Sequence, residues 1–272
     1  MKVGFFDSGL GGVAVLKEAI ENEKLEKEVY FLGDTKNTPY GTKNENEVKV
    51  MIEDNIKYLV DLDCNPIVIA CNTATALSIR ELRAKYKDIV FIGTEPAVKV
   101  ATDAHQNKKI LVLATSITVR QEKLINLIEH LDVNKEDVIL CPADKLVTFA
   151  ENINCLKMSL EIEEYIRELL SKYNLKEFSH IVLGCTHFPL FRQNFENVIN
   201  SISKDLKIEI IDGAKGISKN LIKNIEIMEN EAEKNIKCDK IHIITTSISN
   251  AFESRTKEIL GDRNIVFEYK LQ

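Results

Sequence analysis

The sequence has no tryptophan, only 5 prolines and no long apolar run. Its longest weakly polar stretch, residues 66–79, is interrupted by Asn72, Thr73 and Thr75, and it is shorter than the roughly 20 apolar residues that a membrane-spanning helix needs. The N-terminus reaches Asp7 too soon to contain the apolar region of a signal peptide. We therefore expect a cytoplasmic protein that does not interact with a membrane.

Basic residues are in slight deficit and are scattered along the chain. The 36 Lys and Arg residues are opposed by 42 Asp and Glu residues, which gives a formal net charge of −6. A nucleic-acid-binding surface usually needs a concentrated basic patch, so we expect no nucleic-acid partner. The 272 residues are 44% hydrophobic and 29% charged, a composition typical of a globular protein with one large or two modest domains.

The 6 cysteines form no C-x-x-C pair and show no zinc-like spacing. These absences argue against a redox disulfide motif and against a zinc site. In a reducing compartment such cysteines are free thiols, and the sequence predicts no bound metal. They are Cys64, Cys71, Cys141, Cys155, Cys185 and Cys238.

Short apolar runs rich in β-branched residues alternate with helical patterns along the whole chain. The clearest helical pattern covers residues 44–60, where Asn44 and Glu47 resemble a capping box. Continuous apolar strands joined by helices favour a parallel sheet covered on both faces, and hence an α/β fold. The predicted strands are residues 2–6, 29–32, 67–70, 89–92, 110–114, 138–140, 180–183, 208–211, 241–245 and 265–269.

Two pairs of segments resemble each other. VIACNTA (68–74) and VLGCTHF (182–188) both run from an apolar strand through a cysteine to polar residues that open a helix. VGFFDSG (3–9) and VLATSIT (112–118) are both apolar strands that end in small polar residues. The similarity predicts two similar α/β lobes with polar groups at the carboxyl ends of their strands, where open α/β sheets bind ligands. We expect the active site in the cleft between the lobes.

Cys71 and Cys185 each lie at a predicted turn from strand to helix. A thiol at the N-terminus of a helix is favoured in its thiolate form, which makes it reactive. The alternative is that each cysteine is only a small buried apolar residue. The neighbours favour the reactive interpretation, because Asn72, Thr73 and Thr186 are costly to bury without a purpose.

Asp7 and His187 are the candidate partners of these thiols. His187 lies two positions after Cys185 and can exchange a proton with it, unless it only caps the next helix. Asp7 ends the first strand, where a carboxylate can hold an ammonium group or accept a proton. Its alternative role is to cap the helix after Gly11 and Gly12. The other histidines, His105, His130, His180 and His242, are isolated in the sequence and have no expected role.

Two thiols on opposite sides of one bound carbon can remove a proton from one face and return a proton to the other, which inverts the centre. This chemistry needs two acid/base groups with pKa values near the working pH, and thiols suit it. The sequence thus favours a racemase for a small ligand. The turn-rich segment 33–44 could close over that ligand. Hydroxyl, amide and backbone groups that could hold its polar ends come from Ser8, Tyr40, Gly41, Asn72, Thr73 and Thr186.

Five blocks of sequence together resemble one protein family. They are FFDSGLGGVAVL, GDTKNTPYG, IVIACNTATA, LVLATSIT and HIVLGCTHFPLF, and they lie between residues 5 and 191. In this order and spacing they are similar to the glutamate racemases of the cofactor-independent aspartate/glutamate racemase superfamily. The resemblance implies interconversion of L- and D-glutamate for peptidoglycan synthesis, without pyridoxal phosphate, metal or any other cofactor. It also implies a first lobe of residues 1–96 and 211–272 and a second lobe of residues 97–210.

The resemblance also implies roles for individual residues. Cys71, assisted by Asp7, would be the base toward D-glutamate, and Cys185, assisted by His187, the base toward L-glutamate. Ile117 stands where relatives often carry glycine before the second Thr of the LVLATSIT block. The implied substrate contacts are Asp7, Ser8, Tyr40, Gly41, Asn72, Thr73, Thr186 and His187. The roles of Thr115, Thr118 and Glu151 stay open.

Three other functions compete with this interpretation. The first is the same chemistry on aspartate or another amino acid. The second is a cysteine-dependent hydrolase with Cys185 as nucleophile and His187 as base, which leaves Cys71 without a role. The third is an amino-acid-binding protein without catalysis. A homodimer stays open, because nothing in the sequence sets the oligomeric state.

Overall fold

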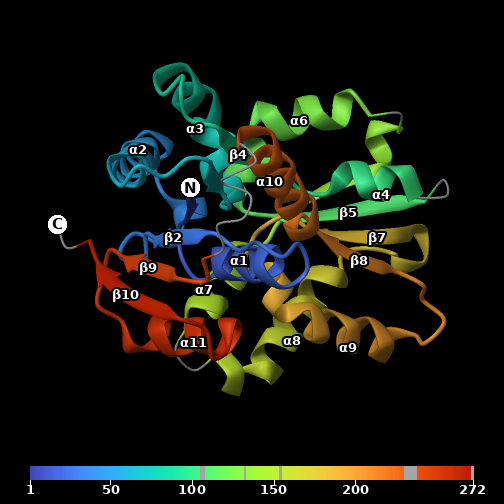
Figure 1. The fold of residues 1–272 in the computed structure, drawn as a ribbon. Coiled ribbons are helices and arrows are strands. Elements are labelled where there is room, and N and C mark those ends of the chain that lie inside the picture. Colours follow the sequence, from blue (N-terminus) through green and yellow to red (C-terminus); the bar gives the residue numbers. More distant parts are fainter. Residues whose placement is uncertain (105–107, 132, 153–154, 230–237, 271–272) are drawn as a thin grey trace. The chain divides into compact units, whose positions relative to one another are not determined.

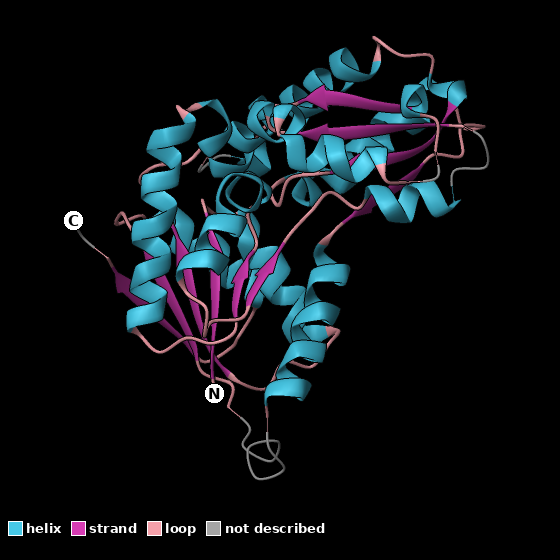
Figure 2. Cartoon of the chain, turned by 90° about the horizontal axis from the view of Figure 1, so that it is seen from above, coloured by secondary structure: helices cyan, strands magenta, loops and turns pink. Residues whose placement is uncertain are grey.

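The computed structural model describes residues 1–104, 108–131, 133–152, 155–229 and 238–270. The chain forms two units: Met1–Thr94 with Ala214–Gln272 make up unit 1, and Glu95–Gly213 make up unit 2. Each unit contains one sheet with helices packed on it (Figure 2). The described residues therefore confirm the predicted α/β fold class. None of the helices in these ranges combines the length and the apolar character needed to cross a membrane.

The sheet of unit 1 has six parallel strands in the order β10-β9-β2-β1-β3-β4. In Figure 1 the red strands β9 and β10 continue the sheet beyond the blue strand β2, so the end of the chain completes the unit that its beginning started. The bounds are β1 Lys2–Asp7, β2 Glu28–Gly33, β3 Ile67–Ile69, β4 Phe91–Gly93, β9 Ile241–Thr245 and β10 Ile265–Tyr269.

The helices of unit 1 follow its strands. In α2 the Asn44 side chain accepts hydrogen bonds from the backbone N–H groups of Asn46 and Glu47, as the predicted capping box requires of its first residue. The apolar face of α2 is buried, with Ile52 and Ile56 fully inaccessible. The bounds are α1 Gly11–Glu21, η1 Tyr40–Thr42, α2 Glu45–Asp61, α3 Asn72–Lys85, α10 Ala214–Met228 and α11 Asn250–Leu260.

The sheet of unit 2 has four parallel strands in the order β6-β5-β7-β8. Its strands are β5 Lys109–Ala114, β6 Val138–Pro142, β7 Phe178–Leu183 and β8 Glu209–Asp212. Its helices are α4 Val98–Ala104, α5 Ser116–Arg120, α6 Glu122–Glu129, η2 Lys135–Asp137, α7 Asp144–Glu151, η3 Cys155–Lys157, α8 Ser159–Leu170, η4 Leu175–Glu177, η5 Phe188–Phe191 and α9 Arg192–Ile202.

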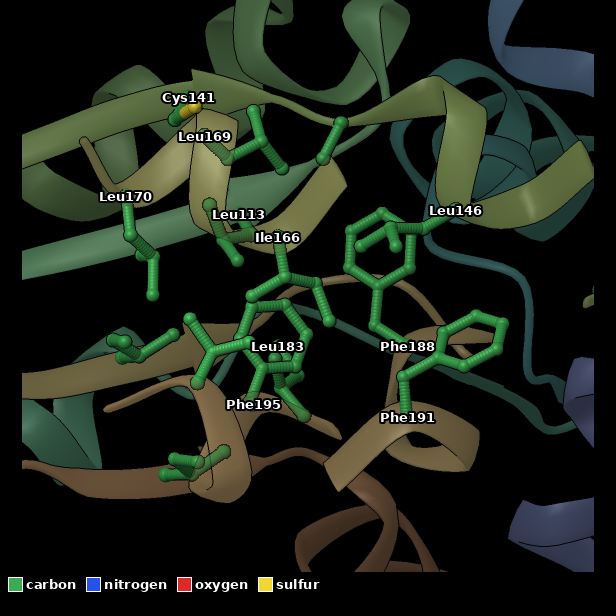
Figure 3. Packing of buried hydrophobic residues seen from close by; sticks show 14 of the residues in the cluster. Leu113, Cys141, Leu146, Ile166, Leu169, Leu170, Leu183, Phe188, Phe191 and Phe195 are labelled. Atoms are coloured by element: carbon green, nitrogen blue, oxygen red, sulfur yellow. The ribbon is translucent and has the colours of Figure 1, made fainter. Parts of the chain in front are cut away.

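One face of the unit 2 sheet packs against α7, α8 and α9. Figure 3 shows Phe188, Phe191 and Phe195 among leucine and isoleucine side chains from the strands and from α8. Phe188 and Phe195 are fully buried. Phe188 and Phe191 belong to the short helix that follows Cys185, so the same core that stabilises the unit fixes the backbone beside this thiol.

The two units share one strand order. The series β2-β1-β3-β4 in unit 1 corresponds to β6-β5-β7-β8 in unit 2. Asp7 ends β1 and Thr115 follows β5, while Cys71 follows β3 and Cys185 follows β7, each at an equivalent strand. The internal similarity predicted from the sequence is therefore confirmed in the topology. In unit 1 the thiol follows β3, which lies next to β1. In unit 2 the thiol follows β7, which lies next to β5.

The predicted strands are found, with shifted ends. β4 begins at Phe91 rather than at Ile89, because the N–H of Ile89 donates to the carbonyl of Tyr86 in a turn. β7 begins at Phe178, two positions earlier than predicted, because it pairs with β5 from Lys109 onward. Local apolar pattern locates a strand, but its partner determines where pairing starts.

Candidate active site

Asp7 is the last residue of β1, and its side chain is fully buried. Its Oδ1 atom accepts a hydrogen bond from the N–H of Gly9 at 3.0 Å and lies 3.4 Å from the Ser8 hydroxyl, which donates to it. Helix α1 begins with Leu10 at its cap position and no side-chain capping bond. Asp7 therefore does not occupy the cap position of α1. Asp7 instead orders the turn that presents Ser8.

Cys71 lies between β3 and α3 and is buried. Its Sγ atom caps α3 by accepting a hydrogen bond from the N–H of Ala74 at 3.5 Å. The same Sγ lies 3.7 Å from the hydroxyl oxygen of Ser8. Ser8 thus connects the thiol of Cys71 with the carboxylate of Asp7. Because the N-terminus of a helix carries partial positive charge, α3 stabilises negative charge on this sulfur.

Asn72 follows Cys71 at the start of α3 and is 8% exposed. Its side-chain oxygen accepts no hydrogen bond from the described residues. A buried acceptor without a donor costs about 1–3 kcal/mol, so such an atom calls for an explanation. A bound molecule with an N–H or ammonium group would satisfy it. Thr73, the next residue, is also buried.

Tyr40 is almost fully buried, and its hydroxyl donates a hydrogen bond to Asp34 at 2.5 Å. Burial and the negative charge of Asp34 raise the pKa of Tyr40 well above its ordinary value, so the hydroxyl stays protonated. This hydroxyl is therefore engaged inside unit 1. Gly41, also buried, follows Tyr40 in η1.

In unit 2, the imidazole of His187 lies between the thiol of Cys185 and the carboxylate of Glu151. The Sγ atom of Cys185 lies 3.7 Å from Nδ1 of His187, and Nε2 of His187 lies 2.5 Å from a carboxylate oxygen of Glu151. His187 is 1% exposed. It occupies the cap position of helix η5, but its side chain makes no capping bond there and lies instead between Cys185 and Glu151. The spacing of two residues brings the imidazole to the thiol, as predicted.

The charge of His187 is decided by competing effects. Burial lowers the pKa of this histidine. The hydrogen bonds from its ring to Cys185 and Glu151, and the negative charge of both groups, raise the pKa, and together they outweigh the effect of burial. The net result is a pKa well above the ordinary value of a histidine. A raised pKa favours the protonated, positively charged form of this ring, and the ring lies beside the sulfur of Cys185.

Three buried threonines of unit 2 were among the residues considered from the sequence. Thr186 is buried between Cys185 and His187. Thr115 caps α5 by accepting from the N–H of Thr118 at 3.3 Å, and the two hydroxyl oxygens lie 2.9 Å apart. The hydroxyl pair therefore already has a structural function at the end of β5.

Two of the remaining titratable residues bear on earlier expectations. Burial raises the pKa of Cys64 to about 12, which keeps this thiol protonated and unreactive. His242, isolated in the sequence, is buried, stacks on Tyr30 and lies within hydrogen-bonding distance of Glu28 and Glu268. His105 lies outside the described residues.

Residue Asp34 was missed by the sequence analysis, and the role of Glu151 was left open. Asp34 is fully buried and holds Tyr40, and Glu151 holds His187. Asp34 belongs to the turn-rich segment 33–44, which the sequence analysis considered as a possible cover for the ligand. The available signal for Asp34 was its position directly after a buried strand. No cluster of three or more metal-ligating side chains occurs in the described ranges.

Comparisons with known proteins identify the family of this chain. The sequence profile of the Asp/Glu/Hydantoin racemase family matches residues 13–217. A glutamate racemase of Clostridium botulinum is 39% identical over 253 residues, which cover 92% of each chain. Glutamate racemase 2 of Bacillus subtilis is 41% identical over 226 residues, which cover 82% of this chain and 81% of that protein.

A solved structure supports the fold. The glutamate racemase isoform RacE1 of Bacillus anthracis superposes with a TM-score of 0.81 over 99% of this chain and 96% of that chain, at 23% identity. At this identity the likeness concerns the fold alone, whereas the family is shown by the sequence matches. The chain belongs to the Asp/Glu/Hydantoin racemase family and is an isomerase.

Proposed function

We propose that this protein is a glutamate racemase that inverts the Cα of glutamate by proton transfer between Cys71 and Cys185. The observation that carries the proposal is the repeated topology. Each unit places one buried thiol after the equivalent strand, Cys71 after β3 and Cys185 after β7. A duplicated arrangement of this kind supplies two similar acid/base groups, which is what a racemase needs for the two faces of one carbon. The glutamate racemases among the relatives support the choice of substrate.

In the proposed reaction, the thiolate of Cys185 removes the Cα proton of L-glutamate. The C–H bond breaks, an S–H bond forms on Cys185, and the electron pair moves into the substrate carboxylate. The thiol of Cys71 then donates its proton to the opposite face of Cα, which produces D-glutamate and leaves Cys71 as a thiolate. The reverse reaction starts from that thiolate. The assignment of each thiol to one enantiomer rests on the family resemblance.

The neighbours of each thiol support these roles. The imidazolium of His187, held by Glu151, stabilises negative charge on Cys185. Cys71 has the N-terminus of α3 and the hydroxyl of Ser8, through which it is connected to Asp7. The two thiols are therefore supported by different means. Such a difference allows each one to be adjusted separately to its own enantiomer.

The polar ends of the substrate have candidate partners in the described residues. The unsatisfied oxygen of Asn72 and the carboxylate of Asp7 are acceptors that suit the ammonium group of glutamate. The backbone of Tyr40 and Gly41 and the hydroxyls of Ser8, Thr73 and Thr186 are groups that suit its carboxylates. The product D-glutamate would supply peptidoglycan synthesis, the role that the family resemblance implies.

The line of Cys185, His187 and Glu151 also favours a second candidate function. A thiol, an imidazole and an orienting carboxylate are the parts of a cysteine-dependent hydrolase. A hydrolase of this kind would form a covalent acyl-enzyme on Cys185 and would be inactive toward free amino acids. It would not need Cys71.

The test is optical. The purified, reduced protein is incubated with L-glutamate and then with D-glutamate, with no added cofactor, and circular dichroism of the amino acid is followed, with aspartate as the control. We expect the signal to decay to zero from both enantiomers. Decay with aspartate alone would show that aspartate, rather than glutamate, is the substrate. No decay with either amino acid would favour the hydrolase.

The two-thiol mechanism is tested with Cys71→Ala and Cys185→Ala. Each substitution is expected to abolish racemisation, because a single remaining thiol cannot serve both faces of Cα. Far-ultraviolet circular dichroism should show that both variants keep the fold. Cys64→Ala, which removes a buried thiol that the mechanism does not use, serves as the matched control. A fully active Cys71→Ala or Cys185→Ala variant would disprove the mechanism.

A further inference from the structure

Helix α7 begins and ends with an acidic residue, and the two carboxylates bind different parts of unit 2. Asp144 is the first residue of the helix and Glu151 is the last. The separation is about two helical turns, or about 10 Å along the axis, so both side chains project from the same side of α7. The helix is therefore held by polar contacts at its two ends.

Asp144 holds the turn that follows β5. Its two carboxylate oxygens lie 3.0 and 3.1 Å from the backbone nitrogen of Ser116, which donates to them, and the Ser116 hydroxyl donates to the same carboxylate. Ser116 is the first residue of α5 and directly follows Thr115. The residue before Asp144, Ala143, donates its N–H to the carbonyl of Ala114 at 2.8 Å. The start of α7 is thus bound to the end of β5 by both backbone and side chain.

The other end of α7 holds His187, which contacts Cys185. Nε2 of His187 lies 2.5 Å from a carboxylate oxygen of Glu151, and Nδ1 lies 3.7 Å from Sγ of Cys185. The residue before this cysteine, Gly184, donates its N–H to the carbonyl of Leu113 in β5 at 2.7 Å. The contacts therefore leave β5 at the start of α7, pass along this helix to the thiol, and return to β5.

The apolar core holds α7 in unit 2, but apolar contacts are non-directional. Leu146 of α7 and Phe188 of η5 are both fully buried in one cluster (Figure 3). Packed helices can slide past one another by small shear movements. The hydrogen bonds of Asp144 are directional, so they set where α7 lies along its own axis. The position of Glu151, at the other end of the helix, therefore depends on Asp144.

We propose that Asp144 is a positioning residue, which fixes α7 so that Glu151 meets the imidazole of His187 beside Cys185. The inference rests on the proposed function in one respect, namely that Cys185 exchanges a proton with Cα of glutamate. Asp144 needs no contact with the substrate. Because Asp144, its partner Ser116 and the whole of α7 belong to unit 2, loss of this carboxylate hinders proton transfer at Cys185 rather than at the other thiol.

The main test is Asp144→Ala, measured with L- and D-glutamate that carry deuterium at Cα. We expect kcat/KM to fall about threefold to tenfold, the size of effect that a contiguous network of contacts transmits. The fall must be equal in both directions, because the two enantiomers have the same free energy. The isotope effect on kcat/KM should rise with L-glutamate, whose deuteron Cys185 removes, and should decrease with D-glutamate, whose deuteron Cys71 removes.

The two isotope effects separate positioning from a merely structural role. A variant that is only less stable contains fewer folded molecules, which lowers kcat for both enantiomers and leaves both isotope effects at their wild-type values. The matched control is Glu161→Ala, which removes an exposed acidic residue from the first turn of α8. The control should change neither the rates nor the isotope effects.

Two milder variants keep the test decisive if Asp144→Ala does not fold. Asp144→Asn retains one side-chain oxygen that can accept the N–H of Ser116, and it should keep most of the wild-type kcat/KM. Ser116→Ala removes only the hydroxyl donor. It should change the two isotope effects in the same directions as Asp144→Ala, by a smaller amount.

A double-mutant cycle tests whether the influence passes through Glu151. In a Glu151→Ala background, Asp144→Ala should lower kcat/KM by less than about a further twofold, because the contact that Asp144 positions is already gone. Independent effects of the two substitutions would overturn the inference. Wild-type isotope effects in Asp144→Ala, with an active wild type, would also overturn it. A wild type that does not racemise glutamate would instead overturn the proposed function and, with it, this positioning role.

Discussion

At the scale of single residues, two glycines determine how closely the backbone packs beside the site. A Cβ atom at Gly12 would lie 2.4 Å from Cβ of Asp7, so only glycine lets α1 start against this carboxylate. A Cβ atom at Gly184 would lie 2.8 Å from the carbonyl oxygen of Leu113. Gly184 immediately precedes Cys185, whereas the position before Cys71 holds the buried Ala70. Unit 2 therefore needs a closer backbone contact to place its thiol.

Glu151→Gln tests the charge of His187. The folded-state pKa of His187 is raised, so its contribution to stability is complete below the ordinary value of about 6.5 and is lost as the pH rises through the folded-state value. Glutamine removes the negative charge and lowers that pKa. We expect the alkaline limb of the kcat/KM profile with L-glutamate to move to lower pH. Profiles for both enantiomers measure the shift.

Glu209→Gln provides the control for that measurement. Glu209 also faces a histidine of unit 2, His180 at 3.5 Å, but its side chain is 70% exposed. This substitution should leave the profile unchanged. Coinciding profiles for Glu151→Gln and the wild type would show that the carboxylate does not set the charge of His187.

Residues that are expensive to bury were the ones that the sequence identified. Asp7, Cys71 and His187 could be selected because each follows an apolar strand, where a polar group needs a reason to be present. The partnership of His187 with Glu151, and that of Tyr40 with Asp34, could not be predicted. Both depend on which side chains tertiary packing brings within hydrogen-bonding distance. The spacing of residues along the sequence does not indicate these contacts.

At the scale of elements, the starts of α2 and α3 differ in kind. Helix α2 is capped by Asn44, which accepts from two backbone N–H groups and is followed by Glu45 and Glu47 in the first turn. Helix α3 is capped by the sulfur of Cys71, a weaker acceptor, and has no acidic residue in its first turn. The cap of α3 is thus suboptimal for stability. It leaves the partial positive charge of the helix available to the thiol.

Asn44→Ala is expected to lower the free energy of unfolding by about 1 kcal/mol, because two N–H groups at the start of α2 lose their acceptor. Urea denaturation followed by far-ultraviolet circular dichroism measures the change. Asn46→Ala, an exposed residue two positions later in the same helix, is the control and should be neutral or slightly stabilising because alanine has the higher helix propensity. Equal stabilities of Asn44→Ala and the wild type would contradict the capping role.

At the scale of the whole molecule, local pattern located the strands but not their order. Parallel strands buried on both faces are continuous apolar runs, so each could be recognised by itself. The pairing of β2 with β9 joins segments from opposite ends of the chain, and no local signal encodes it. The same holds for the hydrogen bond from Thr246 to Asp34, which joins the segment after β9 to the segment after β2.

Phe195→Ala tests whether the core of unit 2 stabilises unit 2 independently of unit 1. Phe195 is fully buried on α9 in the cluster of Figure 3, and its truncation should cost about 3–5 kcal/mol. We expect amide hydrogen exchange, measured by mass spectrometry, to accelerate in β5 and β7 more than in β1 and β3. Phe195→Leu should give a smaller effect in the same strands. Equal acceleration in both units would contradict separate cores.

Unit 1 is built from two stretches of the chain that are separated by unit 2, and this has a consequence for its folding during translation. The strand β2 leaves the exit tunnel early, yet its partner β9 is translated only after all of unit 2 has been made. Until then β2, with the apolar residues Val29, Phe31 and Leu32, is the bare edge of an unfinished sheet, open to pairing with neighbouring nascent chains. Unit 2, uninterrupted in sequence, can fold during that interval. The time needed to translate unit 2 therefore sets how long the edge of β2 stays without its partner strand.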